Sequence, residues 1–296
     1  MFREDFVWGV ASSAYQVEGT DAADGRGACV WDMFAADGRV FEHQNADTSC
    51  DHMHHYKEDI ALMRHLGIRA YRFSLNWARI LPEGTGRVNE KAIAMYRDMI
   101  LTMKENGITP YLTLFHWEFP QALYERGGWQ NPDVVQWFGE YAKVVAENFS
   151  DICEYFITIN EPQCVVGLGH LSGVHAPGVK LPVAQTFLVA HHLLMAHGQA
   201  VINLRRYALR PVKIGFAPTG GVAYPYTDRP EDIEAAKKVY FGFYNPIDNW
   251  TWNVSWFSDP VFLGHYPEEG LKKFAPYLPK ITQEDMELIY QPLDFM

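Results

Sequence analysis

Short apolar runs alternate with longer amphipathic segments along this chain, and this order constrains the fold more than any other feature. The short runs, rich in β-branched and aromatic residues, are Phe6–Ala11, Ala70–Leu75, Thr109–Phe115, Tyr155–Asn160 and Val212–Ala217. Between and after them, helical periodicity and capping residues predict helices at Tyr56–Leu66, Glu90–Asn106, Asp133–Phe149, Pro182–Tyr207 and Pro230–Phe243. Alternation of this kind predicts an α/β fold with parallel strands joined by right-handed crossovers.

The chain is long enough and apolar enough to build one large α/β domain. It has 296 residues, of which 48% are hydrophobic, so it can bury a sizeable core. No repeat, low-complexity tract or Pro/Gly/Ser-rich linker divides it, and we expect residues 1–296 to form a single domain. No GxGxxG or P-loop motif follows any predicted strand, which argues against an open nucleotide-binding sheet and favours a barrel.

Charge and cysteine content exclude several classes of partner. A formal charge of -11 without clusters of Lys or Arg argues against nucleic acid. No apolar stretch approaches membrane-spanning length, and no basic start leads into a secretion signal. The 4 cysteines are scattered without a pairing pattern, as is typical of reduced thiols. We therefore expect a cytoplasmic protein with neither a nucleic-acid nor a membrane partner.

Glu161 occupies an informative position at the end of the fourth apolar run. Pro162 follows it, lacks an amide hydrogen and disfavours a helical conformation in the residue before it. The sequence thus predicts an extended strand that reaches Glu161 and stops there. In barrels of alternating strands and helices, catalytic side chains lie at these carboxyl ends of the strands.

Other polar and aromatic side chains lie at the ends of the predicted strands. They are Gln16 after the first strand, Arg72 and Trp77 around the second, His116 and Trp117 after the third, and Asn160 on the fourth. Amide, imidazole and guanidinium groups beside an indole suit a polyhydroxylated ligand, whose hydroxyls need donors and acceptors and whose ring needs a flat surface. Taken singly, each could equally serve the core, as a lone buried histidine often does.

Five ordered blocks resemble one enzyme family. The segments that carry the resemblance to glycoside hydrolase family 1, the retaining β-glucosidases, are Phe6–Gly19, Tyr71–Ile80, Leu114–Pro120, Thr158–Pro162 and His175–Gly178. The resemblance covers essentially the whole chain and corresponds to about the first two-thirds of a family member. It implies a (β/α)8 TIM barrel that is incomplete here, with five to six of the eight strands, the sixth beginning near Leu293–Met296.

The resemblance also implies an activity and residue roles. The expected reaction is hydrolysis of non-reducing-end β-D-glucosyl or related β-glycosyl residues from small glycosides, without a cofactor or metal. Glu161 would be the general acid/base and Asn160 would bind the sugar 2-hydroxyl. Gln16, His116 and Trp117 would bind the other hydroxyls of the sugar. Arg72 would support the nucleophilic carboxylate, and Cys164 would lie on the aglycone side.

The second carboxylate of such a mechanism is not evident in this sequence. The family carries its nucleophile in a Thr-Glu-Asn-Gly-type block on the seventh strand, which we expect beyond the end of this chain. Glu105-Asn106-Gly107 matches part of that block, but it is predicted to end a helix with a left-handed cap. The histidines of Cys50–His55 are predicted not to bind metal.

Two hypotheses follow for the chain as a whole. In the first it is a β-glucosidase-like hydrolase that needs the rest of the barrel, either in the same chain or from another chain. Its expected partners are a small β-glycoside and either the remaining barrel segment or a second copy of the chain in a homo-oligomer. In the second it is a catalytically silent sugar-binding or assembly fragment of such an enzyme.

Overall fold

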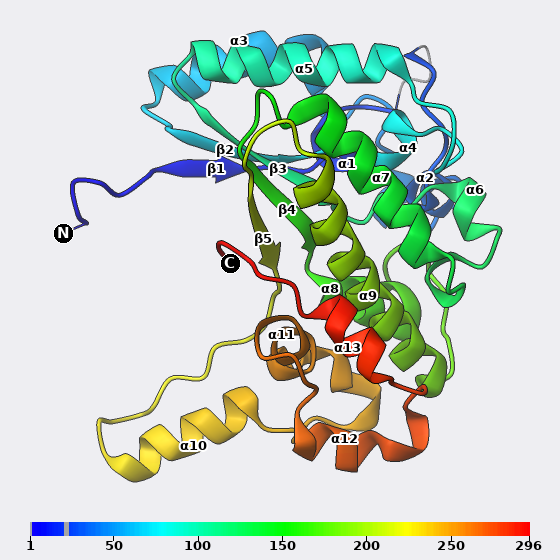
Figure 1. The fold of residues 1–296 in the computed structure, drawn as a ribbon, viewed down its shortest axis with the longest axis vertical. Helices are drawn as coiled ribbons and strands as arrows, with labels where there is room; N and C mark the ends of the chain where they lie inside the picture. The colour runs from blue at the N-terminus through cyan, green and yellow to red at the C-terminus, as the bar shows by residue number, and fades with distance from the viewer. Residues whose placement is uncertain (1, 21–23) are drawn as a thin grey trace.

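The computed structural model describes residues 2–20 and 24–296 and is built around one parallel sheet (Figure 1). Its strand order follows the chain, and every neighbouring pair is parallel. The strands are β1 (Gly9–Ala11), β2 (Ala70–Ser74), β3 (Thr109–Phe115), β4 (Tyr155–Asn160) and β5 (Lys213–Ala217). The predicted alternation and parallel pairing are confirmed, and five parallel strands are those of an incomplete (β/α)8 barrel.

Helices fill the connections between the strands. The main ones are α3 (His52–His65), α5 (Glu90–Glu105), α7 (Val134–Phe149), α9 (Val183–Tyr207) and α10 (Pro230–Phe241). In Figure 1, α7 and α9 run side by side along one face of the sheet, and Asn203 of α9 donates to the Gly139 carbonyl of α7. This arrangement leaves the opposite face for the barrel interior.

Shorter helices lie at the strand ends and in the carboxyl-terminal part of the chain. The α-helices are α1 (Ala14–Val17), α2 (Val30–Ala36), α4 (Trp77–Ile80), α6 (Gln121–Tyr124), α8 (Pro162–Cys164), α11 (Val254–Phe262), α12 (Glu268–Phe274) and α13 (Gln283–Ile289). A π-helical segment, η4 (Val165–Leu171), continues α8. The 3-10 turns are η2 (Phe41–His43), η3 (Gly128–Gln130), η5 (Ile247–Trp252) and η6 (Ala275–Tyr277). Across residues 2–20 and 24–296, no helix is long and apolar enough to cross a membrane.

Three predicted boundaries were wrong, each for a local reason. The first strand is shorter than Phe6–Ala11, because β1 has only β2 as a neighbour and Phe6 and Trp8 remain largely exposed. The second wrong boundary is the start of α3, a helix that is longer than predicted. It begins at His52, four residues before Tyr56, and directly follows Asp51, which has a left-handed conformation. Helix α10 stops at Phe241 because Gly242 takes an extended conformation.

The chain begins a sixth strand beside β5, as predicted. Phe295 forms a parallel bridge with Gly215, and the Asp294 amide donates to the Ile214 carbonyl at 2.8 Å. The Phe295 ring packs edge-on against Tyr111 of β3 and Tyr155 of β4. A β-carbon at Gly215 would collide with that ring as it stands, so glycine leaves room for Phe295 beside β5.

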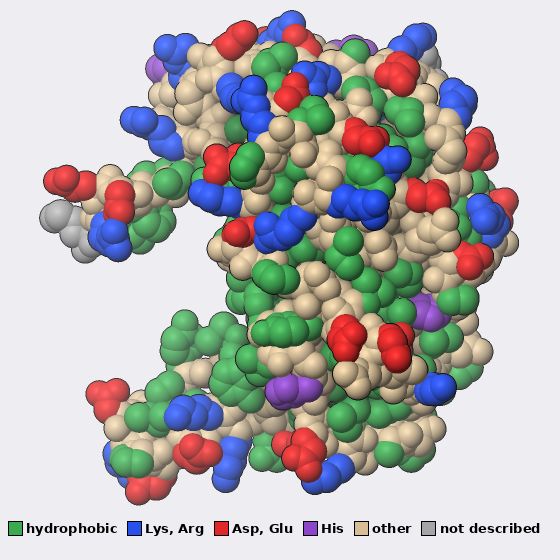
Figure 2. All heavy atoms as spheres, viewed as in Figure 1, with side chains coloured by type: hydrophobic (Ala, Val, Ile, Leu, Met, Phe, Trp, Pro, Cys, Tyr) green, Lys and Arg blue, Asp and Glu red, His purple; other side chains and the backbone are tan. Residues whose placement is uncertain are grey.

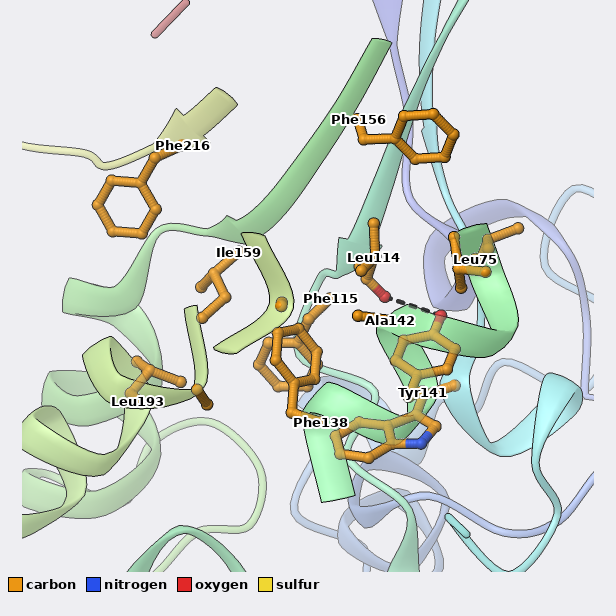
Figure 3. Packing of buried hydrophobic residues seen from close by; sticks show 14 of the residues in the cluster. Leu75, Leu114, Phe115, Phe138, Tyr141, Ala142, Phe156, Ile159, Leu193 and Phe216 are labelled. Atoms are coloured by element: carbon orange, nitrogen blue, oxygen red, sulfur yellow. Dashed lines mark hydrogen bonds between the residues drawn. The ribbon is translucent and has the colours of Figure 1, made fainter. Parts of the chain in front are cut away.

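An aromatic core supports the carboxyl end of β3 from below (Figure 3). Trp77 is fully buried, stacks on Tyr141 with ring centroids 5.0 Å apart, and meets Phe119 edge-on at 5.3 Å. The Tyr141 hydroxyl donates to the Leu114 carbonyl at 3.0 Å, the contact dashed in Figure 3. Buried aromatic pairs of this kind stabilise the fold beyond the effect of the area that they bury. The loop that follows β3 therefore begins at a well-packed position.

One side of the molecule is hollowed and edged with apolar side chains. Figure 2 shows this hollow on the left, between the amino-terminal segment and the region of α10. Large apolar side chains exposed in these two segments are Phe6, Val7, Trp8, Val222, Tyr224, Tyr226, Val239, Phe241 and Tyr244. Their exposure is compatible with the partial extent of the barrel.

Replacing Gly198 with alanine is expected to destabilise the packing of α13 on α9. The added β-carbon would collide with the backbone carbonyl of Leu288, which cannot move as a side-chain tip could. Such overpacking costs about 1–3 kcal/mol of unfolding free energy. Gly221→Ala, whose β-carbon would meet no atom within 4 Å, is the matched control in urea titrations. Equal midpoints for the two variants would contradict the tight contact.

Candidate active site

A register shift in β4 turns Asn160 toward the interior face of the sheet. Tyr155 stacks on Tyr111 there, and side chains alternate between faces along a regular strand, so Asn160 would otherwise face the helices. Between Ile157 and Asn160 the pairing with β5 skips a residue, which marks a bulge. One extra residue reverses the alternation. Asn160 therefore faces the same side as Tyr155 and meets Arg72.

Glu161 lies directly after this bulge in a left-handed conformation. Its φ is 46° and its ψ is 67°, so the prediction of an extended residue before Pro162 was wrong, and β4 ends at Asn160. The Glu161 amide donates to the Ala217 carbonyl at 2.7 Å, and its own carbonyl accepts from the Cys164 amide at 2.9 Å. Non-glycine residues adopt such conformations where surrounding structure imposes them, often in active sites.

Pro162 then opens α8, and this explains the sharp turn at Glu161. Proline suits the first position of a helix, where its missing amide hydrogen costs nothing. The strand therefore passes into the helix within one residue, and the carboxylate is left at the strand tip. The predicted location of Glu161 is confirmed, whereas its backbone conformation is not the predicted one.

Arg72 lies on the same interior face and is held by neighbours that carry no charge. Its Nε donates to Thr113 Oγ1 at 3.0 Å and its Nη2 donates to Asn160 Oδ1 at 2.5 Å. Within residues 2–20 and 24–296 no carboxylate forms an ion pair with it. Burial lowers the pKa of the guanidinium, and Glu161 opposes this effect from a greater distance. A partly buried cation without a counter-charge marks a place suited to an anion.

His116 and Trp117 complete a connected group around Asn160. Asn160 Nδ2 lies 3.3 Å from His116 Nε2, and the Trp117 indole N–H donates to the Asn160 carbonyl at 3.0 Å. Burial, with Arg72 nearby, lowers the pKa of His116 to about 3, so the imidazole is neutral near pH 7 and its Nε2 can accept from the amide. The buried Nδ1 then carries the proton and has no partner among the described residues.

A cleft of about 410 Å³ opens beside this group. His116 and Trp117 form one wall, and the short helix α1 contributes Tyr15 and Gln16. Its remaining lining residues are Ser13, Trp31, Ala35, Val40, Gln44, Asn45, Ala46, Ser49 and His175. Trp117 has a φ of 84°, which directs the chain away from β3 immediately after the indole. The volume falls within the range of small-molecule sites.

Cys164 and His175 also lie close to Glu161. Burial and the nearby Glu161 carboxylate, which accepts a hydrogen bond from the thiol, raise the pKa of Cys164 to about 12. Both residues line an aromatic crevice together with Trp31 and Trp117. The His175 ring lies 5.5 Å from each of these two indoles. Burial lowers the pKa of His175, and Glu161 opposes the shift.

The structure brings most of the predicted site residues together. Arg72, His116, Trp117 and Asn160 form one contact group, Glu161 and Cys164 adjoin it, and Gln16 lines the cleft. Trp77, also noted at a strand end, belongs instead to the core.

Trp31 and His175 were not predicted as part of the site. Trp31 lies in α2, a short helix that the sequence pattern does not predict, so no signal in the sequence placed its ring at the cleft. His175 opens the His175–Gly178 block, and its place in that block was the signal that could have identified it.

Glu105 is excluded from the site, as predicted. It is the last residue of α5, and Gly107 follows in a left-handed conformation with a φ of 73°. Helix α5 leads into the amino-terminal end of β3, which is the end of the sheet opposite to Glu161.

The His52 imidazole is hydrogen-bonded to Asp59 at 2.6 Å. Among the described residues, no group of three or more His, Cys, Asp or Glu side chains is arranged to hold a metal ion.

Comparison with known sequences decides the family. The family described as "Glycosyl hydrolase family 1" matches residues 1–296. The chain belongs to glycosyl hydrolase family 1. It is 42% identical over 296 residues to a 1,4-beta-D-glucan glucohydrolase of Thermotoga neapolitana, covering 100% of this chain and 67% of that protein. It is 40% identical to beta-glucosidase A of Acetivibrio thermocellus, covering 64% of it.

Solved structures of this family share the fold. A beta-glucosidase from Thermotoga maritima in complex with glucoimidazole superposes with a TM-score of 0.88 at 42% identity. The match covers 99% of this chain and 64% of that one. The chain thus spans just under two-thirds of that family member, which accounts for a sheet with five of the barrel's strands.

Proposed function

We propose that this chain carries the acid/base and sugar-binding part of a retaining β-glucosidase. The observation that supports this most directly is the Arg72 cation, partly buried on the interior face and without an ion-pair partner among the described residues. It lies beside Asn160, one residue from a strand-tip carboxylate. A site arranged in this way is ready for a second, anionic group at the position where a nucleophile would stand.

Glu161 acts as the general acid and base in this proposal. It protonates the glycosidic oxygen as the bond to the sugar breaks, and afterwards removes a proton from the attacking water. Asn160 binds the sugar 2-hydroxyl, a contact that strengthens in the transition state. Its amide is already oriented by Arg72 and His116, so little order has to be gained when substrate binds.

The cleft beside Glu161 holds the non-reducing-end sugar. Gln16, His116 and Trp117 line it and supply an amide, a neutral imidazole and an indole ring. Cys164, on the crevice side of Glu161, lies where the leaving group departs.

Turnover requires a carboxylate that the described residues do not place near Glu161. A retaining mechanism needs two carboxyl groups about 5–5.5 Å apart. We propose that the part of the barrel that this chain does not span supplies it, either in the same chain or from another chain. The four free thiols favour a cytoplasmic location.

The alternative function is a sugar-binding or assembly fragment without catalysis. The observation that favours it is the lining of the two cavities that share Trp117 and His175, which includes no carboxylate among the described residues. Robust turnover of p-nitrophenyl β-glucoside by the chain would eliminate this alternative. A folded chain that binds sugar analogues without turnover would support it.

Glucoimidazole binding tests the sugar site without requiring catalysis. We expect the chain to bind it, and Asn160→Ala to weaken binding at least about 5-fold, since a buried hydrogen bond contributes roughly 1–3 kcal/mol when its loss leaves a partner unpaired. Asn148→Ala is the matched control, because its side-chain amide donates to the Val144 carbonyl within α7. Isothermal titration calorimetry measures both. A folded chain that ignores the ligand, or equal affinities for the two variants, would reject the site.

A further inference from the structure

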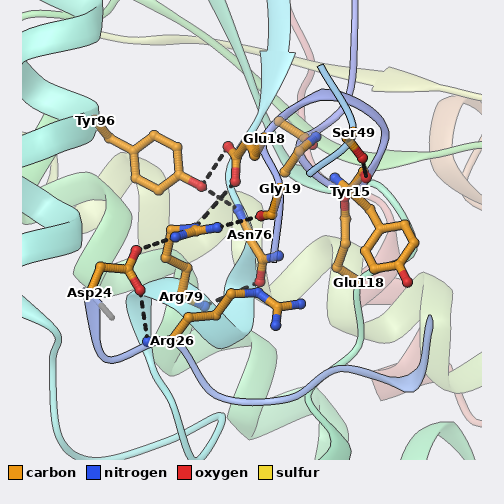
Figure 4. Close-up of polar contacts among 12 residues, drawn as sticks. Tyr15, Glu18, Gly19, Asp24, Arg26, Ser49, Asn76, Arg79, Tyr96 and Glu118 are labelled. Atoms are coloured by element: carbon orange, nitrogen blue, oxygen red, sulfur yellow. Dashed lines mark hydrogen bonds and ion pairs between the residues drawn. The ribbon is translucent and has the colours of Figure 1, made fainter. Parts of the chain in front are cut away.

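Glu118 is a buried carboxyl group immediately behind the cleft and has no part in the chemistry described above. It follows Trp117 and is 1% exposed. Its Oε1 accepts a hydrogen bond from the Tyr15 backbone amide at 2.8 Å, across a separation of 103 residues. Figure 4 shows Glu118 directed at Tyr15, at the edge of the buried polar network.

Tyr15 belongs to α1, a helix too short to hold its own shape. It has four residues, and its N-cap residue Ser13 makes no side-chain capping bond. Isolated helices of this length are unstable, because the free-energy cost of forming the first turn exceeds the gain from the few hydrogen bonds that follow. The first two amides of α1 are instead held by side chains from two strand ends: Ala14 donates to Ser74 Oγ at 2.8 Å, and Tyr15 donates to Glu118.

Gln16 is the residue that this anchoring places. It follows Tyr15, is exposed, and lines the cleft together with His116 and Trp117. The connection is short: Trp117 and Glu118 are adjacent in sequence, and so are Tyr15 and Gln16. The hydrogen bond from the Tyr15 amide to Glu118 thus joins the two walls of the cleft.

We propose that Glu118 is a positioning residue, which fixes Gln16 opposite the His116 and Trp117 wall by accepting the Tyr15 amide. This inference rests on the proposed function, since the geometry it sets is that of the sugar site. Glu118 does not touch the substrate; it acts through the backbone of α1.

The chemistry of the carboxyl group fits a static acceptor. Its second oxygen, Oε2, is buried without a hydrogen-bond partner among the described residues. Burial raises the pKa of Glu118 to about 8; the Tyr15 amide opposes this shift, Glu18 adds to it and Arg26 opposes it. A protonated acid resembles a glutamine side chain in shape and acceptor capacity, so Glu118→Gln should preserve the bond and Glu118→Leu should remove it.

A double-mutant cycle on the full chain tests the link to Gln16. Glucoimidazole affinity is measured for wild type, Glu118→Leu, Gln16→Ala and the double variant. We expect Glu118→Leu to weaken binding about 5- to 50-fold, within the usual range of coupling between contacting groups. In the Gln16→Ala background the same change should have almost no effect. Glu118→Gln should restore wild-type affinity. Additive losses, or no rescue by glutamine, would overturn the proposal.

A second measurement needs no ligand and separates this inference from the proposed function. Amide hydrogen exchange at Tyr15, followed by NMR, should accelerate at least about 10-fold in Glu118→Leu and remain slow in Glu118→Gln, because exchange reports local opening. The Ala14 amide, held by Ser74, serves as the internal reference. If wild type fails to bind glucoimidazole, the sugar site is wrong and the exchange data alone decide the anchoring. An unchanged Tyr15 amide in Glu118→Leu would refute it.

Discussion

Replacing Glu161 with glutamine is expected to lower kcat/KM for p-nitrophenyl β-glucoside about 10²- to 10⁴-fold, the usual contribution of a positioned acid/base. Glutamine keeps the size of the side chain but cannot donate a proton to the leaving oxygen. The assay uses the chain completed with the part of the Thermotoga maritima β-glucosidase that it does not cover, which is expected to supply the second carboxylate.

The leaving group gives this prediction a sharper readout. The 2,4-dinitrophenolate group of a 2,4-dinitrophenyl glucoside leaves with little need for a proton. In Glu161→Gln, cleavage of its glycosidic bond should therefore be slowed far less than cleavage of an alkyl glucoside. Glu105→Gln is the matched control, because it makes the same change in the Glu105-Asn106-Gly107 block at the end of α5. Equal losses for both leaving groups, or any comparable loss in Glu105→Gln, would remove the acid role from Glu161.

Much of the fold was predictable from hydrophobic patterning. β3 and β4 match their predicted bounds, because each is a continuous apolar run bounded by clear turn or cap signals. The left-handed Gly107 after α5 was equally legible, since Asn-Gly at a helix end is a strong local signal. These features depend on a few neighbouring residues, so the sequence alone determines them.

The orientation of the site residues was not predictable in the same way. The bulge in β4 depends on pairing with β5, more than 50 residues away, and nothing in Tyr155–Asn160 itself marks the skipped residue. Glu161 was predicted to be extended because proline normally imposes that conformation. The hydrogen bonds to Ala217 and Cys164 impose a left-handed one instead. Likewise α1 is too short to give a periodic signal, although it carries Gln16.

A second large effect is expected from removing Arg79, which lies at the centre of the buried polar network in Figure 4. Arg79 is 2% exposed; it pairs with Asp24, donates to the Gly19 carbonyl at 2.9 Å, and its Nε lies 3.3 Å from Glu18 Oε2. Arg79→Met would leave Glu18, itself 4% exposed, without its counter-charge. Breaking a buried pair in this way typically costs about 3–5 kcal/mol, which urea titration at pH 7 should show.

The pH dependence of that loss identifies Glu18 as its source. Burial raises the pKa of Glu18, and Arg79 and the Tyr96 hydroxyl, 2.8 Å from Oε1, oppose the shift. Without Arg79 the pKa rises further, so the folded chain keeps a proton that the unfolded chain releases above its pKa of about 4.3. The stability of Arg79→Met should therefore fall as pH rises from about 4, and its deficit relative to wild type should be smaller at pH 4 than at pH 7.

Removing the charge on Glu18 completes the test. The double variant Glu18→Gln, Arg79→Met no longer buries the Glu18 carboxylate, and replacing both members of a buried pair is often nearly neutral. We expect it to recover most of the free energy of unfolding at pH 7, with a deficit relative to wild type that no longer grows between pH 4 and pH 7. If Arg79→Met instead shows the same deficit at both pH values, the loss comes from packing around the arginine stem rather than from the stranded carboxylate.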